Sequence, residues 1–176
     1  FTTPESTDLY RVLRAMRDED VRIVCAEFSS IGLEEHRVDG TAPAIGAYLN
    51  LTQDHLDYHK TMTAYGDAKS SLFLRHLAQG GTAFICVDDD FGRSLHARVT
   101  AERPDLTVWR LSTKHESADV YGALACEASG IHGQVRLPTM TVAVDTPLLG
   151  EFNLQNVAMS VALAACLGLH PSEIER

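Results

Sequence analysis

The chain has 176 residues, of which 45% are hydrophobic and 22% charged, the composition of an ordinary globular protein with one domain. Its 15 basic and 24 acidic residues give a formal net charge of −9, which argues against a broad surface for nucleic acid or anionic membranes. No apolar run approaches transmembrane length and no signal peptide opens the chain, so we expect a cytoplasmic monomer that binds neither nucleic acid nor membrane.

Strand-like and helical patterns alternate along the first two thirds of the chain. Apolar residues at helical spacing predict helices over 4–20, 53–77 and 91–102. Short runs rich in β-branched and apolar residues predict strands over 21–28, 44–52, 82–90 and 106–112. Such alternation is typical of an α/β fold, with a largely parallel, doubly wound sheet and helices on both faces.

The pattern changes between residues 118 and 149. Strand-like segments over 119–129, 133–139 and 140–147 follow one another with only short turns between them. They predict either a small antiparallel part or strands that extend the edge of the sheet. The stretch 152–169 then predicts a helix that is apolar almost all round and therefore buried, with Gly168 and Pro171 after it as stop signals.

Reactive side chains gather where two of the predicted strands end. Glu27 and Ser29 lie at the end of the first strand, and Asp54 and His55 follow the second. Ligands of doubly wound sheets bind beyond the carboxyl ends of the strands. If these strands are neighbours, Glu27 and His55 approach each other and could bind a divalent metal, most commonly Mg²⁺ beside phosphate oxygens. Taken singly, Glu27 could be structural and His55 could simply open a helix.

Lys69 lies on the apolar face of the predicted helix, between Tyr65 and Leu72. A cation that faces the interior is costly to desolvate. A neutral amine can react with CO₂ to form a carbamate, which would turn Lys69 into an anionic oxygen ligand for a metal. The alternative is a lysine whose stem is buried and whose ammonium group reaches solvent.

Three stretches carry a resemblance to a known family. They are "CAEFSSIGLEEHRVDG" at 25–40, "NLTQDHLDYHKTMTAYGDAKSSLF" at 50–73 and "GEFNLQNVAMSVALAACLGL" at 150–169. Together with the opening "FTTPE", they resemble the central ATPase domain of the Mur ligases, and most closely its tripeptide-synthetase branch. These enzymes add amino acids to the UDP-linked muramyl peptide of bacterial cell walls. The resemblance is collinear over residues 1–176.

The resemblance implies a catalytic site with ATP and two Mg²⁺ ions. The glutamate matching Glu27 serves the Mg²⁺ that bridges the β- and γ-phosphates. The lysine matching Lys69 is carbamylated and, with the histidine matching His55, holds the second Mg²⁺. Asn156 would contact adenine, while Asn153 would shape the adenine pocket or cap the helix that it opens.

The resemblance also implies which residues contact the UDP-muramyl peptide. One of them, Glu35, departs from the family pattern, because the tripeptide synthetases frequently have glutamine at this position. The implied substrate residues are Thr2, Thr3, Ser29, Glu35 and Arg37.

The implied reaction is ATP-dependent amide formation on UDP-N-acetylmuramoyl-L-Ala-D-Glu through an acyl phosphate, with a free amino acid as second substrate. The chain contains no G-x-x-x-x-G-K-[ST] phosphate loop, which in the family lies just upstream of the match to Phe1. The family's C-terminal amino-acid-binding domain would follow Arg176. We therefore expect residues 1–176 to be an incomplete central domain that is inactive on its own.

Three other readings remain open from the sequence. A folylpolyglutamate synthase shares the domain and the lysine, but its strand-end motif is usually glycine-rich after the glutamate, where this chain has "EFSS". A metal-dependent hydrolase could use His55 and His59, which are four apart as on a zinc-binding helix, but the adjacent glutamate of such a motif is absent. A non-catalytic binding module on the same fold is the third.

Overall fold

A computed structural model describes residues 3–52 and 56–175. The chain divides into two compact units. The first comprises Phe1–Pro43 and Thr52–Ala78, and the second comprises Ala44–Leu51 and Gln79–Arg176. No helix among the described residues is long and apolar enough to cross a membrane.

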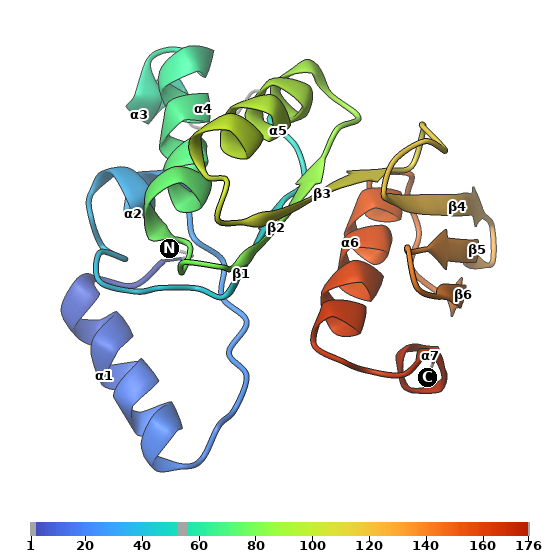
Figure 1. The fold of residues 1–176 in the computed structure, drawn as a ribbon, viewed down its shortest axis with the longest axis horizontal. Helices are drawn as coiled ribbons and strands as arrows, with labels where there is room; N and C mark the ends of the chain where they lie inside the picture. Colours follow the sequence, from blue (N-terminus) through green and yellow to red (C-terminus); the bar gives the residue numbers. More distant parts are fainter. Residues whose placement is uncertain (1–2, 53–55, 176) are drawn as a thin grey trace. The chain divides into compact units, whose positions relative to one another are not determined.

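The second unit contains one six-stranded sheet in the order β1-β2-β3-β4-β5-β6 (Figure 1). Neighbouring strands from β1 to β4 pair in parallel, whereas β4, β5 and β6 pair antiparallel. The α/β prediction is confirmed, and the antiparallel strands extend the same sheet. The strands are β1 (Ile45–Tyr48), β2 (Thr82–Cys86), β3 (Thr107–Ser112), β4 (Val120–Glu127), β5 (Gly130–Arg136) and β6 (Thr141–Thr146).

Two helices, α5 (Asp90–Glu102) and α6 (Asn153–Cys166), cover opposite faces of this sheet (Figure 1). Side chains alternate between the two faces along a strand. Phe84 on β2 therefore joins the hydrophobic core that packs against α6. Its neighbour Ile85, which is fully buried, faces the other side, where α5 buries residues such as Leu95. The helices predicted on both faces are thus present in this unit.

Helix α6 is buried on one face only, so the prediction of a helix buried all round is wrong. Its buried residues are Ala158, Met159, Val161 and Ala162. Cys166 at its end is exposed, because the helix contacts the sheet along a single side. The predicted stop signals are correct. Gly168 adopts φ +87°, a conformation that glycine reaches without strain, and the short helix α7 (Pro171–Ile174) follows.

The first unit is helical in its regular parts. The helix predicted over 53–77 is not continuous, because Lys60 has φ +65° and Thr61 caps a new helix by accepting a hydrogen bond from the Ala64 amide. Residues 53–55 lie outside the described part. The elements of this unit are α1 (Ser6–Asp18), α2 (Ser30–Glu34), α3 (Leu56–His59), α4 (Met62–Ser71) and the π-helical turn η1 (Leu72–His76).

The strand predicted over 21–28 does not form. Val21, Ile23 and Val24 are instead 46%, 52% and 44% exposed. The apolar pattern fits a strand, but a strand is stable only with a neighbour to pair with, and no described segment pairs with this one. Phe28 alone from this stretch packs against the small core of the unit, which is formed by Leu9, Leu33 and Val38.

Candidate functional site

Thr3 is the centre of a hydrogen-bonded cluster in the first unit. Its side chain is almost completely buried, at 1% exposure. The Thr3 hydroxyl accepts a hydrogen bond from the Ser29 amide at 2.8 Å and donates to the Glu27 carbonyl at 3.2 Å. Arg37 Nη1 donates to the Thr3 carbonyl at 3.1 Å. The structure therefore brings together three of the predicted substrate residues, Thr3, Ser29 and Arg37.

The guanidinium of Arg37 is mostly buried, with 13% of its side chain exposed. It forms ion pairs with Glu5, at 3.2 Å, and with Glu35. Its Nε is buried and has no hydrogen-bond partner among the described residues. Tyr58 donates a hydrogen bond to the second oxygen of Glu35 at 3.3 Å. Glu35, a predicted substrate residue, is thus held against Arg37 by the protein itself.

The turn from residue 29 into α2 has a tight backbone. Ser29 caps the helix by accepting a hydrogen bond from the Gly32 amide at 3.1 Å. A Cβ atom at Gly32 would lie 2.8 Å from Thr3 Cβ, so only glycine allows this approach without displacement. The cap and the glycine together fix the Ser29 hydroxyl beside Thr3.

Lys69 lies on α4 and is partly buried. Its Nζ is 5.0 Å from the centroid of the Tyr65 ring, a cation–π distance. Tyr65 and Phe73 on the predicted apolar stripe are buried, whereas Met62 is 37% exposed. The inward stripe therefore begins at Tyr65 rather than at Met62.

The predicted metal ligands are only partly covered by the structure. Glu27 is exposed, and its carboxylate makes no hydrogen bond or ion pair with a described residue. His55 lies outside the described residues, as does Thr2 among the predicted substrate residues. Within the described ranges no three histidine, cysteine, aspartate or glutamate side chains lie together as a metal site. An exposed carboxylate such as that of Glu27 fits a hard cation like Mg²⁺.

His59 has a role that the sequence did not reveal. Its side chain is 0% exposed, and Nε2 is 2.8 Å from the Ser30 hydroxyl. Nδ1 lies 2.9 Å from Glu34 Oε2, close enough for an ion pair but without hydrogen-bond alignment. The ring stacks on Tyr65 at 5.2 Å. Since neither ring nitrogen is accessible, the hydrolase reading that uses His59 as a metal ligand does not fit.

The contacts of His59 connect α2 to the lysine. Glu34 touches His59, His59 stacks on Tyr65, and the Tyr65 ring lies beneath Lys69 Nζ. The sequence indicates only the last of these contacts, because the apolar spacing places Tyr65 and Lys69 on one face of the helix.

The start of α6 holds the predicted adenine residues. Asn156 Nδ2 donates to Asn153 Oδ1 at 2.9 Å, and Asn153 Nδ2 donates to the Leu149 carbonyl at 2.8 Å. Asn153 therefore orients Asn156 and does not cap the helix, so the alternative reading of Asn153 as a cap is wrong. Asn156 is exposed, and its side-chain amide keeps the Oδ1 oxygen and one N–H for a ligand.

Asp88 fixes the start of α6 to the carboxyl ends of two strands, a role that the sequence analysis missed. Its carboxylate accepts hydrogen bonds from the Ser112 hydroxyl, from the amide and hydroxyl of Thr113 at 3.0 and 2.8 Å, and from Gln155 Nε2 at 3.1 Å. Burial alone would raise the pKa of Asp88, but these hydrogen bonds outweigh it and hold the pKa below its usual value. Gln155 lies between Asn153 and Asn156.

Comparisons with known proteins identify relatives of this chain. A UDP-N-acetylmuramoyl-L-alanyl-D-glutamate–2,6-diaminopimelate ligase from Geobacter metallireducens is 38% identical over 98% of this chain and 34% of its own length. The ligase of the same name from Neisseria meningitidis serogroup A is 36% identical over 95% of this chain and 34% of its own. A solved structure of a ligase with this name superimposes with a TM-score of 0.87 at 28% identity, covering 99% of this chain and 35% of that one.

This chain thus spans about a third of the length of the curated relatives that it matches. Residues 1–164 match the family described as the Mur ligase middle domain. That match covers most of the chain, and the fold and the motifs agree with it. The chain belongs to the Mur ligase middle-domain family.

Proposed function

We propose that residues 1–176 are part of the central domain of an ATP-dependent ligase that adds an amino acid to UDP-N-acetylmuramoyl-L-Ala-D-Glu during peptidoglycan precursor synthesis. The observation that carries this proposal is the Thr3–Ser29–Arg37 cluster. These residues are up to 34 positions apart in sequence, and they converge in one hydrogen-bonded group. The names of the relatives support the substrate, since they act on a muramoyl-alanyl-glutamate.

Arg37 has the chemistry to recognise a substrate carboxylate. The guanidinium group of Arg37 is already held in place by the Thr3 carbonyl, so the side chain loses little conformational entropy when a ligand binds. Glu35 forms an ion pair with this guanidinium group, and a substrate carboxylate would have to displace it. The hydroxyls of Thr3 and Ser29 supply further polar contacts beside it.

The reaction proceeds in two steps. The γ-phosphoryl group of ATP passes to an oxygen of the substrate carboxylate and releases ADP, which leaves an acyl phosphate. The amine of the amino acid then attacks the acyl carbon, phosphate leaves, and the amine loses its proton as the amide forms. Asn156, oriented by Asn153, would hold the adenine edge through its amide.

Two Mg²⁺ ions would supply positive charge against the phosphoryl oxygens during the first step. We propose that Glu27 holds one of them and that Lys69, as a carbamate, holds the second together with His55. A lysine ammonium would repel the cation, whereas a carbamate offers the oxygen ligand that Mg²⁺ prefers. We also infer that residues 1–176 alone do not turn over ATP, since they contain no phosphate-loop motif.

The test uses the full-length protein and measures phosphate release that depends on both UDP-N-acetylmuramoyl-L-Ala-D-Glu and an amino acid. Lys69→Ala should lower kcat at least about 100-fold, the scale of a lost transition-state electrostatic group. Lys69→Arg should not restore it, and a small carboxylic acid should partly rescue Lys69→Ala. Lys60→Arg is the matched control, since Lys60 is exposed and should tolerate the change.

Near-full activity of Lys69→Arg would exclude the carbamate while leaving the ligase proposal intact. Absence of amino-acid-dependent phosphate release from the unmodified protein would exclude the ligase itself. Mass spectrometry in bicarbonate buffer gives the direct readout for the modification of Lys69.

A further inference from the structure

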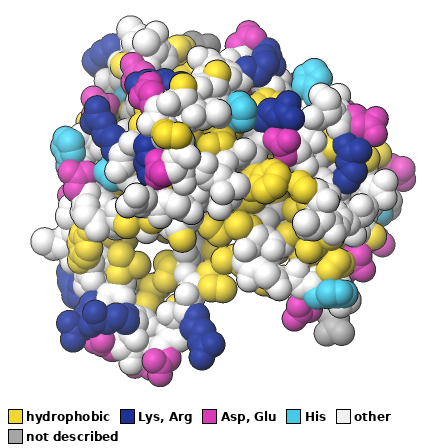
Figure 2. Space-filling model, viewed as in Figure 1, with side chains coloured by type: hydrophobic (Ala, Val, Ile, Leu, Met, Phe, Trp, Pro, Cys, Tyr) yellow, Lys and Arg dark blue, Asp and Glu magenta, His cyan; other side chains and the backbone are white. Residues whose placement is uncertain are grey.

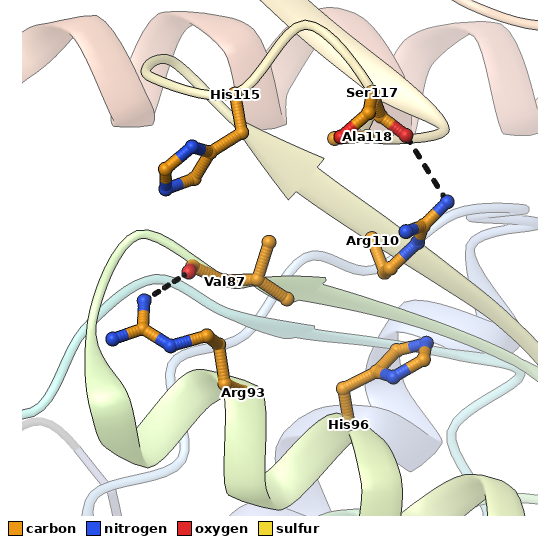
Figure 3. Close-up of a pocket in the computed structure, with 7 residues that line it drawn as sticks. All are labelled: Val87, Arg93, His96, Arg110, His115, Ser117 and Ala118. Carbon is orange, nitrogen blue, oxygen red and sulfur yellow. Dashed lines mark hydrogen bonds between the residues drawn. The ribbon is translucent and has the colours of Figure 1, made fainter.

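The second unit contains a pocket of about 200 Å³ that the proposed ligase reaction does not use (Figure 3). It lies between α5, the end of β2 and the loop that connects β3 to β4. Four of its seven lining residues carry guanidinium or imidazole groups, although the chain as a whole has a net charge of −9. The lining residues are Val87, Arg93, His96, Arg110, His115, Ser117 and Ala118.

Both guanidinium groups are held in place by backbone carbonyls at the wall of the pocket, as the dashed lines in Figure 3 show. Arg93 Nη1 donates to the Val87 carbonyl at 2.9 Å, and Arg110 Nη2 donates to the Ser117 carbonyl at 3.1 Å. Side chains that are already ordered lose little conformational entropy when they bind a ligand. The arrangement is therefore preorganised for a group that accepts hydrogen bonds.

The charges around the pocket are partly balanced. Asp119 pairs with Arg110 at 3.0 Å, and the exposed Asp90 pairs with Arg93. The imidazole of His96 makes no hydrogen bond or ion pair with a described residue. Burial, and after it the nearby Arg110, lower the pKa of His96, while Asp119 acts in the opposite direction. Burial and Arg110 thus disfavour the protonated form of His96, and a bound anion would favour it.

We propose that this pocket binds a phosphate-sized oxyanion, carried either by free phosphate or by a small phosphomonoester. Guanidinium and imidazolium groups donate strong, charge-assisted hydrogen bonds to such oxygens. Drug-sized ligands fill about 300–1,000 Å³, so a smaller pocket suits an ion or a head group. A neighbouring hollow of about 490 Å³ shares His96 and is lined further by Thr100, Arg103, Pro104, Leu106 and Val108, which leaves room for the rest of a phosphomonoester.

The test titrates the full-length protein with inorganic phosphate, and NMR follows the imidazole nitrogen signals of its histidines. The signals of His96 and His115 should move together and saturate. Arg93→Gln should weaken phosphate binding about 10-fold, the equivalent of about 1.4 kcal/mol. Arg98→Gln is the matched control on the same helix, because Arg98 pairs with Glu102 and does not line the pocket. Thermal unfolding checks that both variants are folded.

Sulfate tests the role of the histidine, since its own charge stays constant over the working range. The groups around His96 are Arg93, Arg110, His115 and Asp119. Because an anion raises the pKa of His96, sulfate should bind more tightly as the pH falls from about 8 to about 6. Tighter binding of phenyl phosphate than of inorganic phosphate would identify a phosphomonoester, and equal binding would identify the free ion.

Two results would overturn the proposal. The first is that the His96 and His115 signals do not saturate with phosphate. The second is that Arg93→Gln and Arg98→Gln bind phosphate equally well.

Discussion

Two buried polar side chains in the first unit, Arg37 and His59, each leave one nitrogen without a hydrogen bond among the described residues, but their surroundings differ. Arg37 keeps a buried Nε without a partner among the described residues and faces two carboxylates that a ligand could displace. His59 Nδ1 also lacks an aligned hydrogen bond, but the His59 side chain is fully enclosed and its Nε2 is bonded to Ser30. A buried polar group that lacks a partner costs free energy, and native proteins tolerate this mainly where function requires it. We therefore propose that Arg37, which is partly exposed, binds the substrate, whereas the enclosed His59 positions its neighbours.

His59→Phe tests the positioning role. Phenylalanine keeps an aromatic ring against Tyr65 but cannot bond Ser30, whose buried hydroxyl then loses its partner. The free energy of unfolding should fall by about 1–3 kcal/mol, measured by urea denaturation.

Glu34→Gln is the control for this change. The Glu34 side chain is 51% exposed, so loss of its ion pair with His59 should cost less than about 1 kcal/mol. If Glu34→Gln destabilised the chain as much as His59→Phe, the ion pair and not the buried bond to Ser30 would be the main contribution.

The elements show why some predictions from sequence hold and others do not. Residues 82–86 and 21–28 have similar apolar patterns, but only the first has neighbours on both sides to pair with. Pairing partners far apart in sequence cannot be read from a local pattern. The break at Lys60 was equally hidden, because it depends on one left-handed residue and a threonine cap.

The candidate site could be predicted only in part for the same reason. Thr3, Ser29 and Arg37 were named from motifs and are found together. The contacts of His59 and Asp88 join residues as far as 67 positions apart, and no spacing in the sequence indicates them.

Asp88 and Asp89 lie side by side after β2 and bind different elements. Asp88 bonds the end of β3 and the start of α6. Asp89 accepts hydrogen bonds from the Tyr48 hydroxyl at 3.1 Å and from the Leu51 amide at 3.2 Å, and it caps α5. Asp88 thus connects the end of β2 to β3 and α6, and Asp89 connects it to β1 and the residues that follow β1.

Asp88→Asn should destabilise the chain in a pH-dependent way. The folded pKa of Asp88 lies below the ordinary value of 3.8, so its stabilising effect is present above that value and is lost as the pH falls through the lower, folded pKa. At neutral pH the substitution should cost about 1–3 kcal/mol, since asparagine cannot accept all the bonds that the carboxylate accepts.

The measurement is urea unfolding at neutral and acidic pH, with Asp90→Asn as control. The Asp90 side chain is 99% exposed, so its change should have little effect at either pH. The difference between Asp88→Asn and the unmodified chain should shrink at acidic pH. A cost that stayed constant below the folded pKa of Asp88 would show that the ionised carboxylate is not its source.

At the scale of the whole chain, apolar side chains that remain exposed need an explanation. Phe152 is 75% exposed and Leu149 57%, in addition to the segment 21–24. In Figure 2, hydrophobic side chains reach the surface next to the basic side chains of α1 at the lower left. Exposed apolar side chains on α1 and on residues 21–28 differ in consequence. Helix α1 satisfies its own backbone hydrogen bonds, whereas residues 21–28 have no regular secondary structure and form no ladder with a described segment.

Composition led us to expect a monomer, but the unpaired segment 21–28 leads us to expect that residues 1–176, produced on their own, self-associate through it. A segment with β-branched side chains and no paired strand among the described residues can pair with the same segment of another copy of the chain. The double change Ile23→Thr and Val24→Lys should reduce this association, measured by light scattering or sedimentation at increasing concentration. The free energy of unfolding should change by less than about 0.5 kcal/mol, since both side chains are exposed. Val12→Lys is the matched control, because Val12 is 47% exposed but lies within helix α1. An equal reduction by Val12→Lys would assign the association to general surface hydrophobicity, and a chain that stayed monomeric at all concentrations would contradict the prediction.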